Sequence, residues 1–175
     1  MAVREILLLG NPILRTKCEK VRNFNEPMLR QTIDDLRDTL DDFRATHGFG
    51  RGIAAPQIGI TQRVIFINID KPVVLINPEI IKRSRQMMML WDDCFSFQNI
   101  LAKLKRHLKI TVNYHDEAGK KQILEAVGGL SELLQHENDH VEGILAIDHA
   151  IDSKHIILRS EWKKLTANTK QVYQL

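Results

Sequence analysis

Apolar side chains recur every three or four residues between positions 29 and 43, which places them on one face of an α-helix. This pattern predicts a helix that begins around residues 25–27. Gly48 follows the pattern directly, and glycine is a common residue just past a helix end. Upstream, Asn11 and Pro12 predict a short helix, because asparagine caps helix N-termini and proline fits the first helical position.

The middle of the chain changes to short runs rich in β-forming residues. Six such runs predict strands at residues 63–69, 73–77, 79–83, 87–91, 108–114 and 121–127. The segment HDEAGK between the last two predicts a hairpin turn, in which Gly119 can take a positive φ. Helical patterns return around residues 130–143 and 152–165. Because helices lie towards the ends and strands in the middle, the order favours an α+β fold.

Composition is that of an ordinary globular protein, with 175 residues, 43% hydrophobic and 27% charged. A chain of this length buries about 70% of its unfolded surface, so we expect one domain over residues 1–175. The net charge of +3 would help approach to an acidic partner such as RNA, without identifying a nucleic-acid binder. No apolar run could cross a bilayer and no targeting signal is assembled, so we expect a cytoplasmic protein without a membrane or specific DNA partner.

The segment LLQHENDHVEG (133–143) carries two histidines four residues apart. On a helix His136 and His140 lie one turn apart on the same face, so both imidazoles can reach one metal ion. Glu137 is rotated about 100° away, which suits contact with a water molecule at the metal better than ligation. The pattern H-E-x-x-H therefore predicts a metal-dependent hydrolase. The alternative is the solvated polar face of a surface helix.

A catalytic metal site of this type needs a third protein ligand. The metzincin pattern fails here, because Ala146 stands where that pattern has its third histidine. Glu161 is one candidate, although it lies among charges typical of a solvated face. Cys94, in LWDDCFSF after a predicted strand, is another, since a thiolate binds zinc or ferrous iron strongly. The other cysteine, Cys18, is interpreted as structural, and no disulfide is expected.

Three segments together resemble the peptide deformylases. They are GRGIAAPQ (50–57), DDCFS (92–96) and QHENDH (135–140), where that family carries G-x-G-x-A-A-x-Q, E-G-C-L-S and Q-H-E-x-D-H in the same order. The first and third match closely, and the second is degraded. The resemblance covers most of the chain, including GNPILRTKCEKV near the N-terminus. It implies a deformylase-like fold, with antiparallel or mixed sheets around a central H-E-x-x-H helix, an N-terminal helix and a C-terminal helix.

The resemblance also implies a role for individual residues. Glu137 would take a proton from the attacking water and return it to the leaving amine. The Gln57 side chain and the backbone N–H of Phe95 would hold the oxyanion that develops on the formyl group. One divalent ion is implied, ferrous iron in the native enzyme, with zinc, nickel and cobalt as the other metals that such a site accepts. Its implied ligands are Cys94, His136 and His140.

The implied substrate pocket departs from the family's apolar methionine pocket at Arg51 and Glu132. A glutamate facing a methionine side chain would be costly unless Arg51 pairs with it. The alternative is that both side chains point to solvent. Leu101 stands where many members carry an arginine that grips the substrate backbone. The expected substrate-binding residues are Gly50, Arg51, Gly52, Ile53, Leu90, Leu133 and Glu132.

The predicted function is metal-dependent removal of the N-formyl group from the formyl-methionine of nascent polypeptides, with release of formate. Two alternatives stay open: a deformylase acting on a different N-formyl amine, and a weakly active relative that binds metal or peptide. The C-terminal helix is basic, which is compatible with contact to ribosomal RNA or with a plain solvated face. Its basic residues are Lys154, Arg159, Lys163, Lys164 and Lys170.

Overall fold

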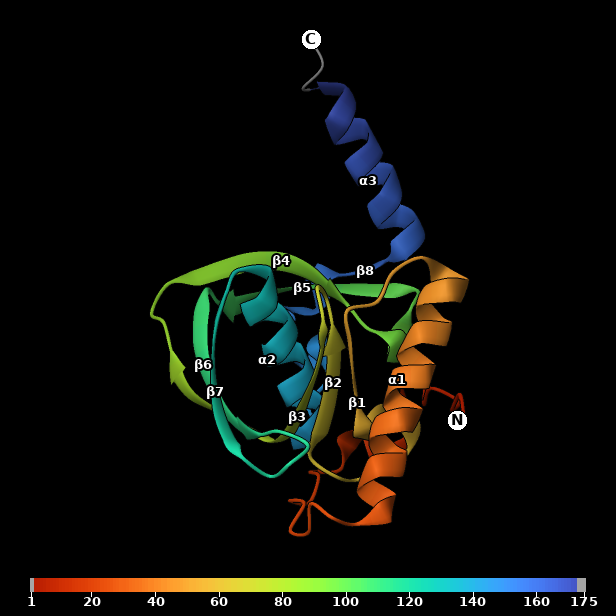
Figure 1. Ribbon diagram of the computed structural model, residues 1–175. Helices are drawn as coiled ribbons and strands as arrows, with labels where there is room; N and C mark the ends of the chain where they lie inside the picture. The colour runs from red at the N-terminus through yellow and green to blue at the C-terminus, as the bar shows by residue number, and fades with distance from the viewer. Residues whose placement is uncertain (1, 173–175) are drawn as a thin grey trace.

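The computed structural model describes residues 2–172, and Figure 1 shows how their helices and strands are arranged. The α-helices of this part of the chain are α1 (Pro27–His47), α2 (Gly129–Glu142) and α3 (Arg159–Val172). Short 3-10 helices lie between the main elements. They are η1 (Pro12–Arg15), η2 (Ala55–Ile58), η3 (Phe95–Phe97), η4 (Ala146–His149) and η5 (Ser153–His155).

The helix predicted near the N-terminus is confirmed as α1. It begins at Pro27 and ends where Gly48 takes a left-handed φ of 77°. Its buried apolar face packs against β1 (Gly52–Ala54) and β2 (Val64–Asn68). The short helix predicted upstream is η1, where the side-chain oxygen of Asn11 accepts a hydrogen bond from the N–H of Ile13 at 3.0 Å.

A five-stranded antiparallel sheet has the order β1-β2-β3-β6-β7. Its remaining strands are β3 (Pro72–Arg83), β6 (Lys109–His115) and β7 (Lys121–Val127). The two strands predicted at 73–77 and 79–83 are one strand, β3. The separation between them was wrong because the chain bends at Asn77 (φ 53°) without leaving the sheet, and the pairing with β6 only shifts its register there. The predicted hairpin turn is confirmed, with Gly119 at φ 77°.

A three-stranded antiparallel sheet has the order β4-β5-β8. Its strands are β4 (Met87–Asp93), β5 (Ile100–His107) and β8 (Ile156–Leu158). The sequence analysis missed β5, and it placed β8 inside a helix over residues 152–165. That helix begins at Arg159, because Ile156 and Leu158 pair with Ala102 and Ile100 of β5. Pairing with a distant strand decides the conformation of such a short segment.

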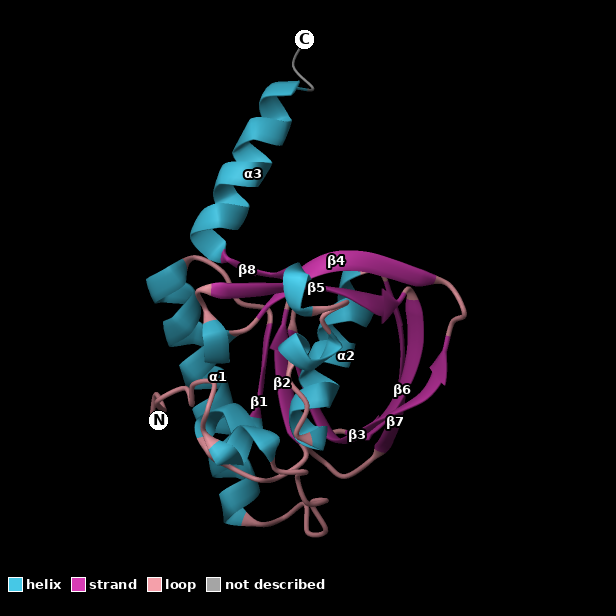
Figure 2. Ribbon diagram, turned by 180° about the vertical axis from the view of Figure 1, so that it is seen from behind, coloured by secondary structure: helices cyan, strands magenta, loops and turns pink. Residues whose placement is uncertain are grey.

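The helix α2 lies between the two sheets, and Figures 1 and 2 show strands on both sides of it. Most of its residues are buried, including polar ones such as Gln135 and Asn138. A helix that is buried all round is normally apolar, so the polar groups of α2 need partners inside the molecule. The α+β fold class and the central position of the H-E-x-x-H helix are confirmed.

The last helix, α3, projects away from the rest of the molecule (Figures 1 and 2). Its apolar residues are few, and most of the residues from 159 to 167 are exposed. Within residues 2–172, no helix combines the length and the apolar character needed to cross a membrane.

Candidate active site and metal centre

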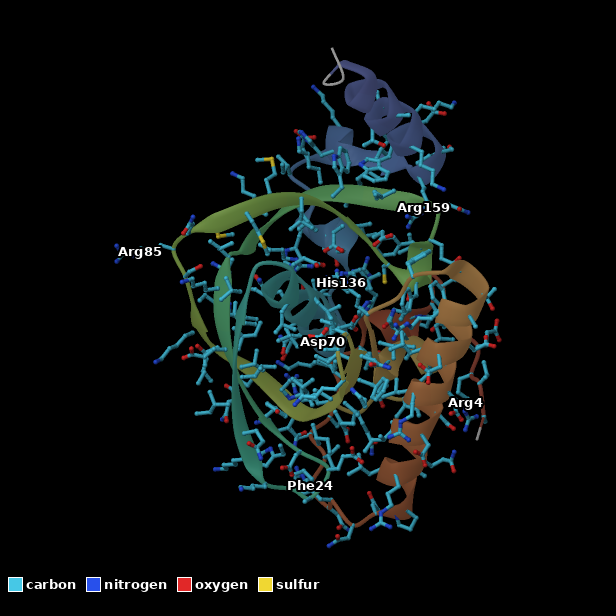
Figure 3. The ribbon with its side chains drawn as sticks, turned by 45° about the horizontal axis from the view of Figure 1, so that its top comes forward. Arg4, Phe24, Asp70, Arg85, His136 and Arg159 are labelled. Carbon is cyan, nitrogen blue, oxygen red and sulfur yellow. The ribbon has the colours of Figure 1, made fainter. Side chains whose placement is uncertain are left out.

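Two histidines of α2 and one cysteine meet in the interior. One donor atom from each of Cys94, His136 and His140 lies within 4.8 Å of the others, and all three residues are buried. The Cys94 Sγ is 3.2 Å from the Nε2 of His140, and the two imidazole rings have centroids 5.0 Å apart. Figure 3 shows His136 in the centre of the molecule. Glu161, the other candidate ligand, is exposed on α3 and pairs with Lys164.

The local structure explains why these side chains meet. Cys94 follows the last residue of β4 and precedes the η3 turn, and its Sγ accepts a hydrogen bond from the N–H of Ser96 at 3.4 Å. His136 and His140 are one turn apart on α2, as the spacing predicted. Gly143 ends this helix in a left-handed conformation with φ 77°, where an added Cβ would lie 2.7 Å from the carbonyl oxygen of Arg15.

A charged network fixes the orientation of His136. Its Nδ1–H donates to the Oδ1 of Asp92 at 2.9 Å, which leaves Nε2 as the atom available to a metal. The other Asp92 oxygen lies 3.1 Å from Arg106, and Arg106 also pairs with Asp139. Burial alone would raise the pKa of Asp92, but His136 and Arg106 lower it to about 2. The carboxylate therefore stays ionised. On the outer side, His149 lies 3.1 Å from Asp139.

The residues present fit a metal ion. One thiolate and two imidazoles form a donor set suited to zinc or ferrous iron. Buried polar atoms normally have hydrogen-bond partners. In residues 2–172, however, the Oε2 of Glu137 and the Nδ1 of His140 are buried side-chain atoms without one. Unpartnered polar atoms beside a converging donor set are expected where an ion and its water belong.

Glu137 lies between the two histidines on α2 and lines the same cleft as Cys94 and His136. An added Cβ at Gly52 would lie 3.0 Å from the Oε1 of Glu137, so only glycine lets β1 approach this closely. Burial raises the pKa of Glu137 to about 7, although the charge of His136 opposes this shift. A carboxyl group with such a pKa can both accept and return a proton near neutral pH.

Gln57 presents its amide group to the same site. Its Oε1 accepts a hydrogen bond from the N–H of Ala54 at 2.9 Å, so its Nε2 turns towards Cys94 Sγ and Ser96 Oγ, at 3.5 and 3.4 Å. Phe95 is the first residue of the η3 turn, where backbone N–H groups have no partner within the helix. An amide N–H and a backbone N–H therefore lie close to Cys94, one of the three candidate ligands.

A cleft of about 340 Å³ opens over these residues. Its lining includes Cys94, His136, Glu137 and Gln57, together with the segment between α1 and β1. The full set is Arg44, Gly48, Phe49, Gly50, Arg51, Gly52, Gln57, Asp93, Cys94, Phe95, Glu132, Leu133, His136 and Glu137. The arrangement can hold a small carbonyl group against a metal ion, with a proton carrier at its side.

Comparison with known proteins agrees with this chemistry. The sequence model of the polypeptide deformylase family matches residues 3–155. The peptide deformylase of Pseudothermotoga lettingae is 35% identical over 97% of this chain and 94% of its own, and that of Syntrophomonas wolfei is 39% identical over 88% and 97%. The crystal structure of a peptide deformylase from Legionella pneumophila aligns with a TM-score of 0.81 and 31% identity over 99% of both chains.

This chain belongs to the polypeptide deformylase family. The predicted family and fold are thereby confirmed, and the chain is an enzyme of the class of metal-dependent hydrolases, as predicted. Which metal the deformylase site holds is not decided by its ligand set, because zinc and ferrous iron accept the same donors.

Five of the seven expected substrate-binding residues line the cleft of this deformylase. They are Gly50, Arg51, Gly52, Leu133 and Glu132. Ile53 and Leu90 are not among the residues that line it in the described part of the chain. Ile53 is fully buried in the core beneath α1, and Leu90 packs beside Leu14 under the three-stranded sheet. A role for these two residues in substrate binding stays a prediction, and their side chains pack in the core or against it.

The altered pocket of this deformylase holds an ion pair. The Nη2 of Arg51 lies 2.5 Å from the Oε2 of Glu132, and its Nη1 donates to the carbonyl oxygen of Gly129 at 3.2 Å. The Glu132 side chain is 11% exposed and the Arg51 side chain 48%, so a buried carboxylate is neutralised from the solvent side. The two residues therefore meet at the cleft, and neither points to solvent alone.

Four residues that line the cleft were not predicted as site residues: Arg44, Gly48, Phe49 and Asp93. Phe49 carried a signal, since it stands between Gly48 and Gly50 directly before the first motif. An aromatic residue in a glycine-rich turn has few local partners and often packs across a site. Arg44 lies on the last turn of α1 and carried no comparable signal.

Proposed function

We propose that this protein removes the N-formyl group from the formyl-methionine end of nascent polypeptides by hydrolysis, and releases formate. The observation that carries the proposal is the buried Glu137 carboxylate, whose Oε2 has no partner within residues 2–172, beside the converging donors of Cys94, His136 and His140. A formyl group offers an enzyme little to bind, so catalysis on it requires donors that meet in one small space.

The residues that would hold the metal are Cys94, His136 and His140, and we propose one divalent ion, ferrous in the native enzyme. When bound, such an ion supplies Lewis acidity, which polarises a carbonyl group and lowers the pKa of water. The Asp92 carboxylate accepts the Nδ1–H of His136 and so orients the imidazole for ligation through Nε2. Zinc, nickel and cobalt would be accepted by the same donor set.

Glu137 would carry the proton. Its Oε2 accepts the proton of the attacking water and then returns it to the leaving amine nitrogen, which breaks the bond between the formyl carbon and the amine. The pKa of about 7 that burial gives this carboxyl group suits both transfers at neutral pH. Because Gly52 has no side chain, the Glu137 carboxylate has room beside β1.

Gln57 and Phe95 would hold the oxyanion. The Nε2 of Gln57 is a fixed donor, because the Oε1 of the same side chain is occupied by the backbone of β1. The backbone N–H of Phe95 is a second donor at the start of η3. Fixed donors of this kind stabilise developing charge without reorganising during the reaction.

The ion pair of Arg51 and Glu132 favours a second candidate within the same chemistry. A cleft wall that carries a guanidinium group and a carboxylate is less suited to a methionine side chain than an apolar wall. An N-formyl amine with a polar side chain would exchange hydrogen bonds with this pair. The second candidate is therefore deformylation of such a substrate.

We also propose that α3 contacts ribosomal RNA, which would bring the deformylase to nascent chains in the cytoplasm. The support is the basic surface of a helix that projects from the molecule, with Lys163 exposed beside Lys164 (Figure 1). The side chain of Lys170 lies outside the described part.

Pelleting the protein with ribosomes tests the proposed contact of α3 with ribosomal RNA. We expect the protein to bind ribosomes, and the binding to weaken between low and high salt. If a chain that ends at residue 158 pellets equally well, α3 does not make the contact.

The deciding experiment for the activity measures formate release from formyl-Met-Ala by iron-loaded protein under anaerobic conditions. A formylated peptide with a polar first residue and a formylated non-peptide amine are compared with it. Turnover of formyl-Met-Ala supports the main proposal, and preference for another amine supports the second candidate. Protein that binds metal but releases no formate from any of them would be a weakly active relative.

A further inference from the structure

Arg159, the first residue of α3, is attached to the segment that follows Cys94. Its backbone N–H donates to the carbonyl oxygen of Asn99 at 2.8 Å, and its Nε donates to that of Gln98 at 2.6 Å. Its Nη2 pairs with the carboxylate of Asp93. Figure 3 shows Arg159 where α3 leaves the body. The residue lies beyond the part of the chain that matches the family model, residues 3–155.

The same guanidinium group contacts a second segment of the cleft. Its central carbon lies 5.4 Å from the centroid of the Phe49 ring, within the range of a cation–π interaction. Phe49 and Asp93 both line the cleft, one before β1 and the other at the end of β4. Arg159 therefore joins two cleft segments that are far apart in the sequence.

The Phe49 segment depends on such contacts for its position. Gly48 and Gly50 flank it with φ of 77° and 136°, so the backbone there is intrinsically permissive. The Phe49 side chain is exposed, and its ring contacts are those with Phe43, His47, Phe95 and Arg159 among the described residues. Without the guanidinium group of Arg159, the Phe49 segment loses one of the few contacts that hold it in position.

Asp93 depends on Arg159 for a different reason. Asp93 precedes Cys94 in the chain and lines the cleft. The ion pair with Arg159 neutralises the Asp93 carboxylate and holds it at the start of α3. Unpaired, the carboxylate would leave a negative charge at the cleft, which would repel the carbonyl oxygens of a bound peptide.

We propose that Arg159 is a positioning residue that holds Phe49 and Asp93 and thereby orders the cleft for the part of the substrate beyond its formylated residue. The proposal rests on the proposed deformylation. Arg51 and Glu132 form a separate ion pair in the cleft lining, so we expect different groups to contact the formylated residue and the chain that follows it.

The test compares Arg159→Gln with Arg37→Gln as a matched control. Arg37 also pairs with an acidic residue, Asp34 at 2.8 Å, and its guanidinium carbon lies 5.7 Å from the ring centroid of Phe66. It is not among the residues that line the cleft. Both variants therefore lose an ion pair and a cation–π contact, and only Arg159→Gln loses them at the cleft, together with the hydrogen bond from Nε to Gln98.

We expect Arg159→Gln to raise KM for formyl-Met-Ala-Ser roughly tenfold while kcat changes less than about threefold, because positioning is lost and the reacting groups remain. KM for formyl-Met amide, which has no residue after methionine, should change less than about threefold. Arg159→Lys should recover part of the loss, since it keeps the charge without the planar fork. Arg37→Gln should leave both constants within about twofold for either substrate.

A second variant separates the role of Asp93. In an Asp93→Gly background no carboxylate is left unpaired, so Arg159→Gln should raise KM for the tripeptide by a smaller factor than in the wild type. Should Arg159→Gln fail to fold, Phe49→Leu removes the other contact and carries the same expectation for the two substrates. Equal losses for the tripeptide and the amide, an unchanged KM for the tripeptide, or the same loss in Arg37→Gln would overturn the proposal.

A binding measurement keeps the two proposals distinguishable. If the wild-type protein releases no formate from any substrate, the proposed deformylation fails by itself. Calorimetric affinity of zinc-loaded protein for the product peptide Met-Ala-Ser then decides on Arg159. Binding roughly tenfold weaker in Arg159→Gln than in Arg37→Gln supports the positioning role, and equal binding overturns it.

Discussion

The metal end of the cleft and its substrate end are built in different ways. At the metal end Cys94, His136 and Glu137 are all buried, and His136 is held by a network that is itself buried. At the substrate end the side chains of Arg51 and Asp93 are 48% and 38% exposed, and each belongs to an ion pair. The groups that we propose for chemistry are enclosed, and the groups that we propose for recognition include some that solvent reaches.

This difference indicates which changes the molecule can absorb. A buried group without its partner costs the full desolvation of what is left, whereas an exposed group can turn to water. Substitutions at the substrate end should therefore alter preference with little effect on the metal site, and substitutions at the metal end should affect everything. The following experiments test that division, from the largest expected effect to the smallest.

Replacing the proton carrier should have the largest effect on turnover. We expect Glu137→Gln to lower kcat for formyl-Met-Ala by roughly 10²–10⁴, because the amide cannot accept the proton of water. Metal content, measured by elemental analysis, should stay near one ion per chain as in the wild type. Loss of the metal in this variant would mean that Glu137 ligates it.

Removing the charge behind His136 should have the next largest effect. Asp92→Asn takes away the ionised acceptor of the His136 Nδ1–H and one of the counter-charges of Arg106. We expect zinc affinity, measured by competition with a chelator, to fall by roughly 10–100-fold. Asp34→Asn, which removes the partner of exposed Arg37, serves as the control. An unchanged affinity would show that the metal end tolerates change as the substrate end does.

Replacing Glu132 with an apolar residue should change which substrate is preferred, without affecting the metal site. Glu132→Ile is expected to raise kcat/KM for formyl-Met-Ala relative to a formylated peptide with a polar first residue by roughly 3–30-fold, because more of the methionine side chain is then buried. Metal content should not change. If the ratio between the two substrates stays constant, Glu132 does not contact the substrate side chain.

The ion pair itself predicts an asymmetry in stability. Arg51→Ile leaves the mostly buried carboxylate of Glu132 without its partner, and we expect the free energy of unfolding of metal-free protein to fall by about 1–3 kcal/mol. Glu132→Ile leaves only the half-exposed Arg51, so the change should lie within about 0.5 kcal/mol. Denaturation in urea measures both. Equal losses in the two variants would contradict the burial difference between the partners.

Local patterns in the sequence were sufficient for the parts of the fold that depend on near neighbours. The spacing of His136 and His140 predicted their shared face on a helix, and the apolar spacing of α1 predicted its extent, because both follow from helical geometry alone. The choice of Cys94 over Glu161 could not be made from spacing. It depended on a resemblance, and the geometry then brought Cys94 to the histidines.

Features that depend on contacts between residues far apart in the chain could not be predicted from local sequence patterns. β8 is three residues long and is a strand because β5 lies beside it, so local propensity could not separate it from the helix that follows. Leu90 and Ile53 were assigned to the pocket through the family resemblance, and sequence alone could not show that Ile53 is buried in the core and that Leu90 packs against it. Arg159 pairs with Asp93 across 66 positions, and no periodicity reports such a contact.

The chain of charges behind His136 also constrains how this protein can evolve. Asp92 in β4, Arg106 in β5 and Asp139 on α2 come from three different elements, and each neutralises its neighbour. A mutation at Arg106 alone would deprive both carboxylates of their guanidinium counter-charge and leave each with a histidine as its ionisable partner, His136 for Asp92 and His149 for Asp139. Accepted substitutions along this chain should therefore arise together, so that the three positions vary as one inherited unit.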